Sequence, residues 1–160
     1  MYDQRENLSL TAEQQTLLEK TYKSFTRNGA NLSFDDKGRL REIDKQLATL
    51  KLKFSENVLA ETQHYQWVIT DKEQLSGLPD FVLEMLAQEA QKHHTQGWVI
   101  TLDMPVYTAV MKYADNRDLR QKLFTDYHSR CAGDSPYNNE ANVLRIAELR
   151  QARASLLGYP

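Results

Sequence analysis

SFDDKGRLREIDKQLATLKLKFSENVLAETQ, residues 33–63, carries the clearest secondary-structure signal in the chain. Ser33 is a favourable helix N-cap, and Asp35 and Asp36 follow where acidic groups interact favourably with the positive end of a helix dipole. No Gly or Pro interrupts residues 39–63, so we predict one long helix over about 33–63. Its apolar residues recur at steps of three and four, the pattern of a coiled-coil-like stripe: Leu40, Ile43, Leu47, Leu50, Phe54 and Val58.

A second helix is expected before this stretch. Thr11 and Gln14 form the capping-box pattern, in which each side chain accepts a hydrogen bond from the backbone N–H of the other residue. Apolar residues follow at helical spacing, and Asn28-Gly29 supplies a left-handed stop. We therefore predict a helix over about 11–28.

The chain beyond the long helix contains the same four residues twice, as Trp67-Val68-Ile69-Thr70 and Trp98-Val99-Ile100-Thr101. β-Branched and aromatic residues beside turn formers favour strands, so we predict a small two-stranded ribbon at about 65–70 and 98–102. The two strands should pair, because an isolated strand leaves its backbone groups unsatisfied. Antiparallel pairing is expected, although a helix between the strands would also permit a parallel crossover.

Four further helices complete the expected architecture. They are a helix from Pro79 to about His93, one from Pro105 through Ala114, one capped by Asp115 with Leu119, Leu123 and Tyr127 on one face, and one that begins near Asn139 and stops at Gly158. The predicted fold class is mainly α, a multi-helix domain with a small β ribbon. No internal linker is visible, so we assign residues 1–160 to a single domain.

Composition excludes several classes of function. Lys and Arg (20) nearly balance Asp and Glu (22), which leaves a net charge of −2 and no basic footprint for nucleic acid. No apolar run approaches the roughly 20 residues that a membrane span needs, and the polar N-terminus has no signal-peptide core. The single cysteine rules out an intramolecular disulfide. These features favour a cytoplasmic location, with the periplasm left open.

No pattern in the sequence indicates a complete active site. None of the four histidines lies in an H-E-x-x-H motif, and the adjacent His93 and His94 diverge by about 100° on a helix, so we interpret them as solvated residues and not as metal ligands. Cys131 stands beside Arg130, whose charge would lower the pKa of the thiol, but no partner base is identifiable. We assign no catalytic, cofactor-binding or metal-ligating residue.

Two other sets of residues have both a functional and a structural interpretation. Asp115 and Asp118 are three apart and could form an acid–base pair, but capping is preferred at a helix start. Tyrosines could also line a groove for peptides or sugars: Tyr107, Tyr113, Tyr127 and Tyr137. Tyr107 and Tyr113 flank the apolar Val110, so core packing is the preferred interpretation.

A series of short fragments carries a resemblance to a known family. In chain order they are Asn28-Gly29-Ala30-x-Leu32, Phe54-Ser55-Glu56-Asn57-Val58-Leu59, Gly77-Leu78-Pro79, Gly97-Trp98-Val99-x-Thr101-Leu102, Pro105-x-Tyr107, Tyr113-Ala114-Asp115-Asn116-Arg117-x-Leu119-Arg120 and Leu149-Arg150-x-x-Arg153-Ala154-x-Leu156-Leu157-Gly158-Tyr159. Their order and spacing over positions 20–159 resemble the N-terminal helical region of the thimet-oligopeptidase family of zinc metallopeptidases. Val106 departs from the serine that is usual in the family.

The resemblance implies a parent protein that hydrolyses short peptides, with zinc held by an H-E-x-x-H motif beyond residue 160. This chain would then be an excised, non-catalytic fragment, inactive alone, that scaffolds and walls a substrate channel. Its partners would be the remainder of the peptidase and, in the intact enzyme, short peptide substrates. The resemblance does not select one branch of the family. The long helix with Phe54–Leu59 favours the peptidyl-dipeptidases, whereas Thr101–Tyr107 favours oligopeptidase A.

Two further expectations concern contacts with other chains. As an alternative function, the chain would be an independent helical interaction module that binds a partner helix through the stripe over residues 40–58. As a fragment, it would also keep apolar faces that the parent covers, namely this stripe and the face with Val143, Ile146 and Leu157. Such faces predict self-association into a two-fold dimer, as an artefact of excision.

Overall fold

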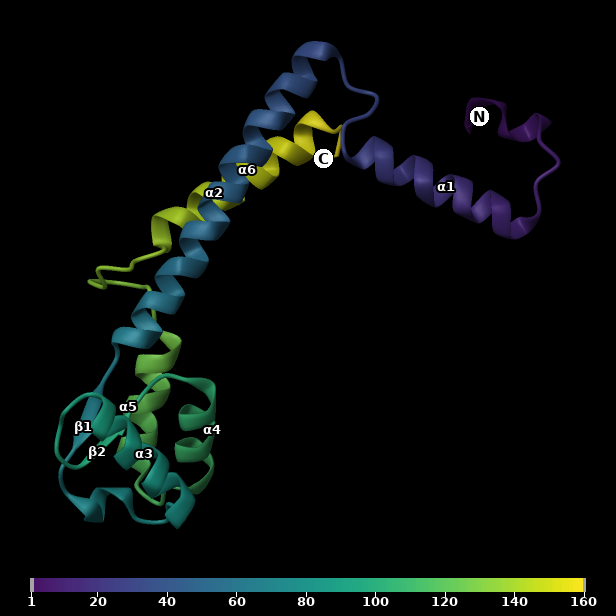
Figure 1. Ribbon diagram of the computed structural model, residues 1–160. Coiled ribbons are helices and arrows are strands. Elements are labelled where there is room, and N and C mark those ends of the chain that lie inside the picture. Colours follow the sequence, from purple (N-terminus) through teal and green to yellow (C-terminus); the bar gives the residue numbers. More distant parts are fainter. Residues whose placement is uncertain (1, 160) are drawn as a thin grey trace. The chain divides into compact units, whose positions relative to one another are not determined.

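The computed structural model describes residues 2–159 and is mainly helical, with one two-stranded sheet (Figure 1). Its contacts divide the chain into two compact units. Unit 1 combines the residues up to Lys51 with those from Leu144 onward, and unit 2 runs from Leu52 to Val143. Helices α2 (Phe34–His64) and α6 (Glu140–Leu156) contribute to both units. The mainly α fold class is confirmed, and a single domain over 1–160 stays a prediction.

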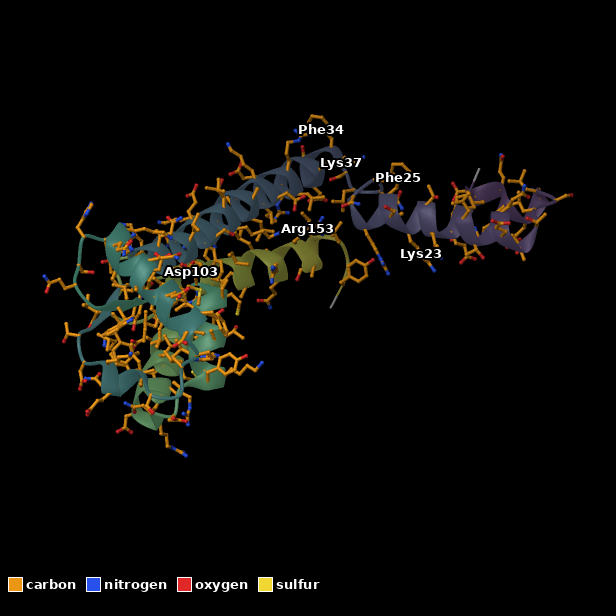
Figure 2. The ribbon with its side chains drawn as sticks, turned by 60° about the horizontal axis from the view of Figure 1, so that its bottom comes forward. Lys23, Phe25, Phe34, Lys37, Asp103 and Arg153 are labelled. Carbon is orange, nitrogen blue, oxygen red and sulfur yellow. The ribbon has the colours of Figure 1, made fainter. Side chains whose placement is uncertain are left out.

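Unit 1 begins with a short 3₁₀-helix, η1 (Tyr2–Asn7), which the sequence analysis missed, followed by α1 (Ala12–Arg27). The predicted capping box is present, because the Gln14 backbone N–H donates to Thr11 Oγ1 at 3.3 Å and the Thr11 N–H donates to Gln14 Oε1 at 3.0 Å. All of α1 is described, and none of its side chains is buried. Phe25, on this helix, is 64% exposed, and its side chain points outward (Figure 2).

Helix α2 starts where the sequence predicted, with the Asp36 backbone N–H donating to Ser33 Oγ at 3.1 Å. Its predicted stripe is only partly covered: Leu40 and Leu47 are buried, while Phe54 is 37% exposed. A second row of leucines, Leu52 and Leu59, is more exposed than any stripe residue, at 60% and 58%. Helix α2 therefore carries apolar side chains on more than one face.

Within unit 1, α6 lies beside α2 (Figure 1). Leu149 of α6 is buried, as are Leu40 and Leu47 of α2, and each buried leucine contributes about 1.5–3 kcal/mol. Arg153 Nε donates to Asp44 Oδ1 at 2.7 Å, and an exposed pair of this kind adds at most about 1 kcal/mol. Burial of these leucines therefore contributes more to the stability of unit 1 than this ion pair does.

In unit 2 the two predicted strands form the antiparallel ribbon, β1 (Trp67–Ile69) with β2 (Trp98–Ile100). Trp67 is opposite Ile100, and Ile69 is opposite Trp98. The prediction of pairing is confirmed, although each strand has three residues and is shorter than expected. Ile69, Val99 and Ile100 are buried, so the ribbon contributes directly to the core.

The rest of unit 2 consists of η2 (Lys72–Leu75), α3 (Asp80–Lys92), α4 (Met104–Tyr113) and α5 (Arg117–His128), with the core between the helices and the ribbon. The expected helices are present, with two corrections at their starts. Pro79 is the N-cap of α3 and not its first helical residue. Asn116, not Asp115, caps α5, because its side chain accepts from the N–H groups of Asp118 and Leu119 at 3.1 and 3.2 Å.

No helix in the described residues is long and apolar enough to cross a membrane.

Val143, which was expected on an apolar face of the last helix, is 51% exposed, whereas Ile146 and Leu157 are half-buried. Leu149 is the buried apolar residue of α6.

Candidate functional site

The buried thiol of Cys131 lies in the loop between α5 and α6, at the centre of a polar cluster. Its backbone adopts a positive φ of 59°, and its N–H donates to Glu61 Oε2 at 2.6 Å. The same Glu61 oxygen accepts from Ser135 Oγ at 2.7 Å. The Glu61 carboxylate of α2 therefore accepts hydrogen bonds from two residues of this loop.

The environment of Cys131 is opposite to that of a reactive thiol. Burial, then hydrogen bonding to Glu61 and the negative charge of Glu61, raise the pKa of Cys131 from 9.0 to about 11. Arg130 lowers this pKa, as the sequence suggested, but by less than the other causes raise it. Its guanidinium is also engaged elsewhere, donating to Tyr127 O at 2.9 Å and Thr62 Oγ1 at 2.8 Å. At neutral pH the thiol is protonated and is not a nucleophile.

A network of asparagines ties the start of α6 to α2. Asn139 is buried, its Oδ1 accepts from Asn57 Nδ2 at 2.9 Å and from Asn142 Nδ2 at 2.8 Å, and its own Nδ2 donates to Phe54 O at 3.1 Å. Its backbone N–H donates to Cys131 O at 2.8 Å, so the network continues into the Glu61 loop. The sequence analysis missed this role, although Asn57 lies in one of the family-like fragments.

A second polar cluster, also missed, joins α5 to the residues before the ribbon. The Tyr65 hydroxyl donates to Asp126, and Lys122 Nζ lies 2.5 Å from Asp126 Oδ2. Burial, reinforced by Asp126, raises the pKa of Tyr65. Lys122 Nζ also lies 4.8 Å from the Trp67 ring centroid. A tyrosine with a raised pKa cannot serve as a base near neutral pH, so this cluster holds elements together.

Asp115 and Asp118 do not form an acid–base pair. Asp115 Oδ2 accepts from Ser76 Oγ at 3.0 Å, and its backbone N–H donates to Ser76 O at 2.8 Å, while Asp118 lies in the first turn of α5. Gly77 forms a tight turn with a φ of +85° and lies close to the end of α4. A Cβ added at Gly77 would lie only 2.5 Å from Tyr113 O. The two hydrogen bonds between Asp115 and Ser76 therefore stabilise this turn.

The four tyrosines do not converge on one groove. The rings of Tyr107 and Tyr127 stack at 4.0 Å between centroids, and both pack against the core of unit 2. Tyr113 meets Phe81 edge to face, and Tyr137 contacts His64. Core packing accounts for the first three, as the preferred interpretation expected.

The histidines are spread over the ends of three helices. The Nδ1 atoms of His64 and His128 lie 2.7 and 2.9 Å from carbonyl oxygens four residues earlier, and His93 Nδ1 lies 2.8 Å from Gln66 Nε2. His94 has a φ of 54° just after α3. Within residues 2–159, no three His, Cys, Asp or Glu side chains come close enough to hold a metal ion.

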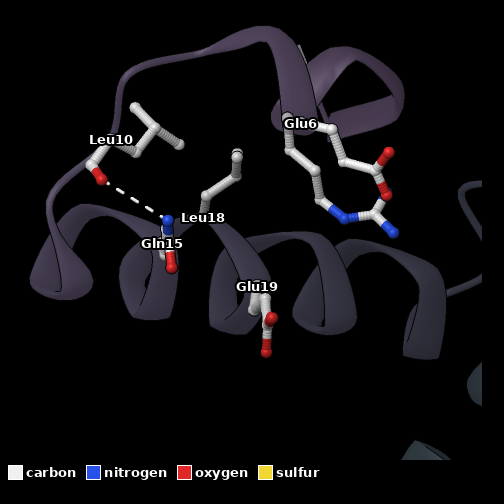
Figure 3. A pocket seen from close by; sticks show the side chains of 6 residues that line it. Glu6, Leu10, Gln15, Leu18 and Glu19 are labelled. Atoms are coloured by element: carbon white, nitrogen blue, oxygen red, sulfur yellow. Dashed lines mark hydrogen bonds between the residues drawn. The ribbon is translucent and has the colours of Figure 1, made fainter.

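Pockets also occur on the surface of unit 1. One pocket, of about 200 Å³, lies between η1 and α1 (Figure 3). It is lined by the apolar Leu10 and Leu18 and by the acidic Glu6 and Glu19. Gln15 Nε2 donates to Leu10 O at 3.4 Å across its edge. Another is lined by three arginines, Arg27, Arg150 and Arg153.

The chain is similar over most of its length to curated peptidases. It is 39% identical over 158 residues to "Probable cytosolic oligopeptidase A" of Arabidopsis thaliana, covering 94% of this chain and 22% of that protein. It is 30% identical over 155 residues to "Oligopeptidase A" of Salmonella typhimurium (94% and 23%) and 29% identical over 161 residues to "Dipeptidyl carboxypeptidase" of Escherichia coli (100% and 24%). No protein-family model matches the chain.

These observations define a mainly α segment that is homologous to peptidases. The relatives are members of the thimet-oligopeptidase family, so the resemblance carried by the sequence fragments is confirmed. The chain spans less than a quarter of the length of the curated relatives named here, at most 24%. Similarity extends to both the oligopeptidase A and the dipeptidyl carboxypeptidase branch.

Proposed function

We propose that this chain is a non-catalytic segment of a zinc-dependent oligopeptidase that hydrolyses short peptides. The observation that carries the proposal is the similarity over 94–100% of the chain to proteins named as oligopeptidases and as a dipeptidyl carboxypeptidase. Because the chain spans only about a fifth of these relatives, the remainder of the parent would supply the catalytic groups. A cytoplasmic location is part of the proposal, and the name of one Arabidopsis relative supports it.

The described residues do not fit a zinc site. Zinc sites need three or four His, Cys, Asp or Glu ligands around one point. Here the ring nitrogens of His64, His93 and His128 each have a different polar neighbour at a different helix end. Zinc in the parent would therefore be held by residues outside this chain, and no step of hydrolysis is assigned to the residues described here.

The role we propose for the segment is to scaffold the peptidase and to wall its substrate channel. Helix α2 supports this role, because it has buried apolar residues (Leu40, Leu47) and well-exposed ones (Leu52, Leu59). A helix with apolar residues beyond one stripe is typical of a helix that is covered on more than one side. The additional cover would come from the remainder of the parent.

Replacing the matching segment of Escherichia coli oligopeptidase A with this chain tests the proposal. We expect the chimera to bind zinc and to hydrolyse a short fluorogenic peptide, whereas deleting the segment should abolish the activity. A chimera that is folded and loaded with zinc but inactive would contradict the proposed role. The isolated chain should retain no stoichiometric zinc after dialysis and should cleave no peptide.

An independent helical interaction module is the alternative function, and the exposed Leu52 and Leu59 are the observation that favours it. The coding sequence that follows residue 160 distinguishes the two. An H-E-x-x-H motif in the same reading frame is expected for the peptidase segment. A stop codon or an unrelated domain would favour the module.

A further inference from the structure

Three arginines converge on one surface pocket of unit 1, at the C-terminal ends of α1 and α6. The pocket has a volume of about 380 Å³. We call it the arginine pocket, and its lining residues are Arg27, Arg150, Arg153, Ala154, Leu157 and Tyr159.

Among the residues that the structure describes, two of the three guanidinium groups have no acidic partner. Arg153 Nε donates to Asp44 Oδ1 at 2.7 Å, which both neutralises this arginine and fixes its orientation against α2 (Figure 2). Within residues 2–159, the side chains of Arg27 and Arg150 make no hydrogen bond or ion pair, and both residues are exposed. Like charges that converge without counter-charges repel each other, so the pocket has an electrostatic preference for an anion.

Helix dipoles explain only part of this arrangement. Arg27 and Arg153 lie in the last turns of α1 and α6, where a cation interacts favourably with the terminal carbonyl groups. That effect accounts for one arginine on each helix. It does not account for the third, Arg150, which lines the same pocket from one turn earlier on α6.

The chemistry of the lining specifies the kind of anion. Guanidinium groups present planar forks of N–H donors that match carboxylate and phosphate oxygens. Ala154 and Leu157 are half-buried and add an apolar wall, beside which charged hydrogen bonds are less screened than in open water. We propose that the arginine pocket binds an oxyanion, a carboxylate or a phosphate, held by Arg27 and Arg150 and supported by the Asp44-anchored Arg153.

Two ligands test the proposal and distinguish the sources of the oxyanion. The full chain, labelled with ¹⁵N, is titrated with inorganic pyrophosphate and, separately, with glutarate while its NMR spectrum is recorded. We expect saturable shifts that centre on Arg27, Arg150 and Tyr159. Tighter binding of pyrophosphate would identify a phosphate ligand, and tighter binding of glutarate would identify a carboxylate from a peptide or protein.

Matched variants separate a site from general charge attraction. Arg150→Gln and Arg27→Gln change exposed side chains on two different helices, and each should weaken binding of the preferred ligand about tenfold. Arg145→Gln removes the same charge from α6 outside the pocket, where Arg145 Nη1 pairs with Glu148 at 2.9 Å, and should leave the affinity within about twofold. Equal weakening in all three variants, or shifts that do not saturate with either ligand, would overturn the proposal.

Discussion

Glu61 Oε2 lies 2.6 Å from the backbone nitrogen of Cys131, a residue 70 positions away in the sequence. The same oxygen accepts the hydroxyl hydrogen bond of Ser135, so a single side chain of α2 positions the loop that leads into α6. The Cys131 backbone has a positive φ, which an L-residue adopts only when its surroundings compensate the cost. Glu61 supplies part of that compensation.

Removing the Glu61 carboxylate should destabilise unit 2. In Glu61→Ala, the Cys131 N–H loses its acceptor in a buried position, so we expect the free energy of unfolding to fall by about 1–3 kcal/mol. Glu61→Gln keeps one acceptor oxygen and should cost less. Urea unfolding measures both, with Glu56→Ala, an exposed carboxylate on the same helix, as the control. Equal losses in Glu61→Ala and Glu56→Ala would show that the loop does not depend on Glu61.

The raised pKa of Cys131 predicts a loss of stability in alkaline solution. Well below pH 9.0 the thiol is protonated in both folded and unfolded chains, so its contribution is fully present. Between pH 9.0 and about 11 it ionises first in the unfolded chain, and the free energy of unfolding falls.

Comparing the wild type with Cys131→Ala isolates this contribution, because the titration of Tyr65 is common to both chains. The difference in unfolding free energy should be constant well below pH 9.0, and above pH 9.0 the wild type should lose stability relative to Cys131→Ala. A difference that stays constant up to pH 11 would mean that folding does not protect the thiol from ionisation.

Gly77→Ala should be strongly destabilising. The backbone of Gly77 has a φ of +85°, and an added Cβ would lie 2.5 Å from Tyr113 O and 2.7 Å from Asp115 Cγ. We expect a loss of about 2–3 kcal/mol in urea unfolding. Gly38→Ala is the matched control, since Gly38 lies in α2 with open space around it and should gain about 0.5–1 kcal/mol. A neutral Gly77→Ala would refute the close approach at this turn.

The exposed leucines of α2 indicate which surface would mediate the predicted self-association of the chain. Leu52 and Leu59 are seven residues apart, share one face and are 60% and 58% exposed. We expect a second copy of the chain to cover this face at high concentration, in a two-fold arrangement. Light scattering over a hundredfold concentration range should detect the dimer, and the double variant Leu52→Ser, Leu59→Ser should remove it. A wild-type chain that stays monomeric throughout would contradict the prediction.

Local signals in the sequence predicted local structure well. The starts of α1 and α2 are confirmed at Thr11 and Ser33, because a cap depends on residues within four positions of each other. The ribbon was also predictable, since two short β-rich segments leave each other as the nearest partners. The 3₁₀-helices η1 and η2 were missed because such short elements carry no hydrophobic period.

Features that depend on distant residues were not predictable. Asn116 and not Asp115 caps α5, because the Asp115 carboxylate is already hydrogen-bonded to Ser76. Ser76 is 39 residues earlier in the sequence, before α3 and α4, so local sequence could not reveal this contact. The pKa of Cys131 was expected to fall because of its neighbour Arg130, yet burial and Glu61 raise it. In both cases the deciding contact is tertiary.

The shielded thiol of Cys131 has a practical consequence for spectroscopy. It is the only cysteine in the sequence, and at neutral pH it is both buried and protonated. A maleimide dye or a nitroxide would therefore react first with a cysteine introduced at an open position. Gly38→Cys provides such a position on α2, so fluorescence or spin-resonance probes can be attached there without first replacing Cys131.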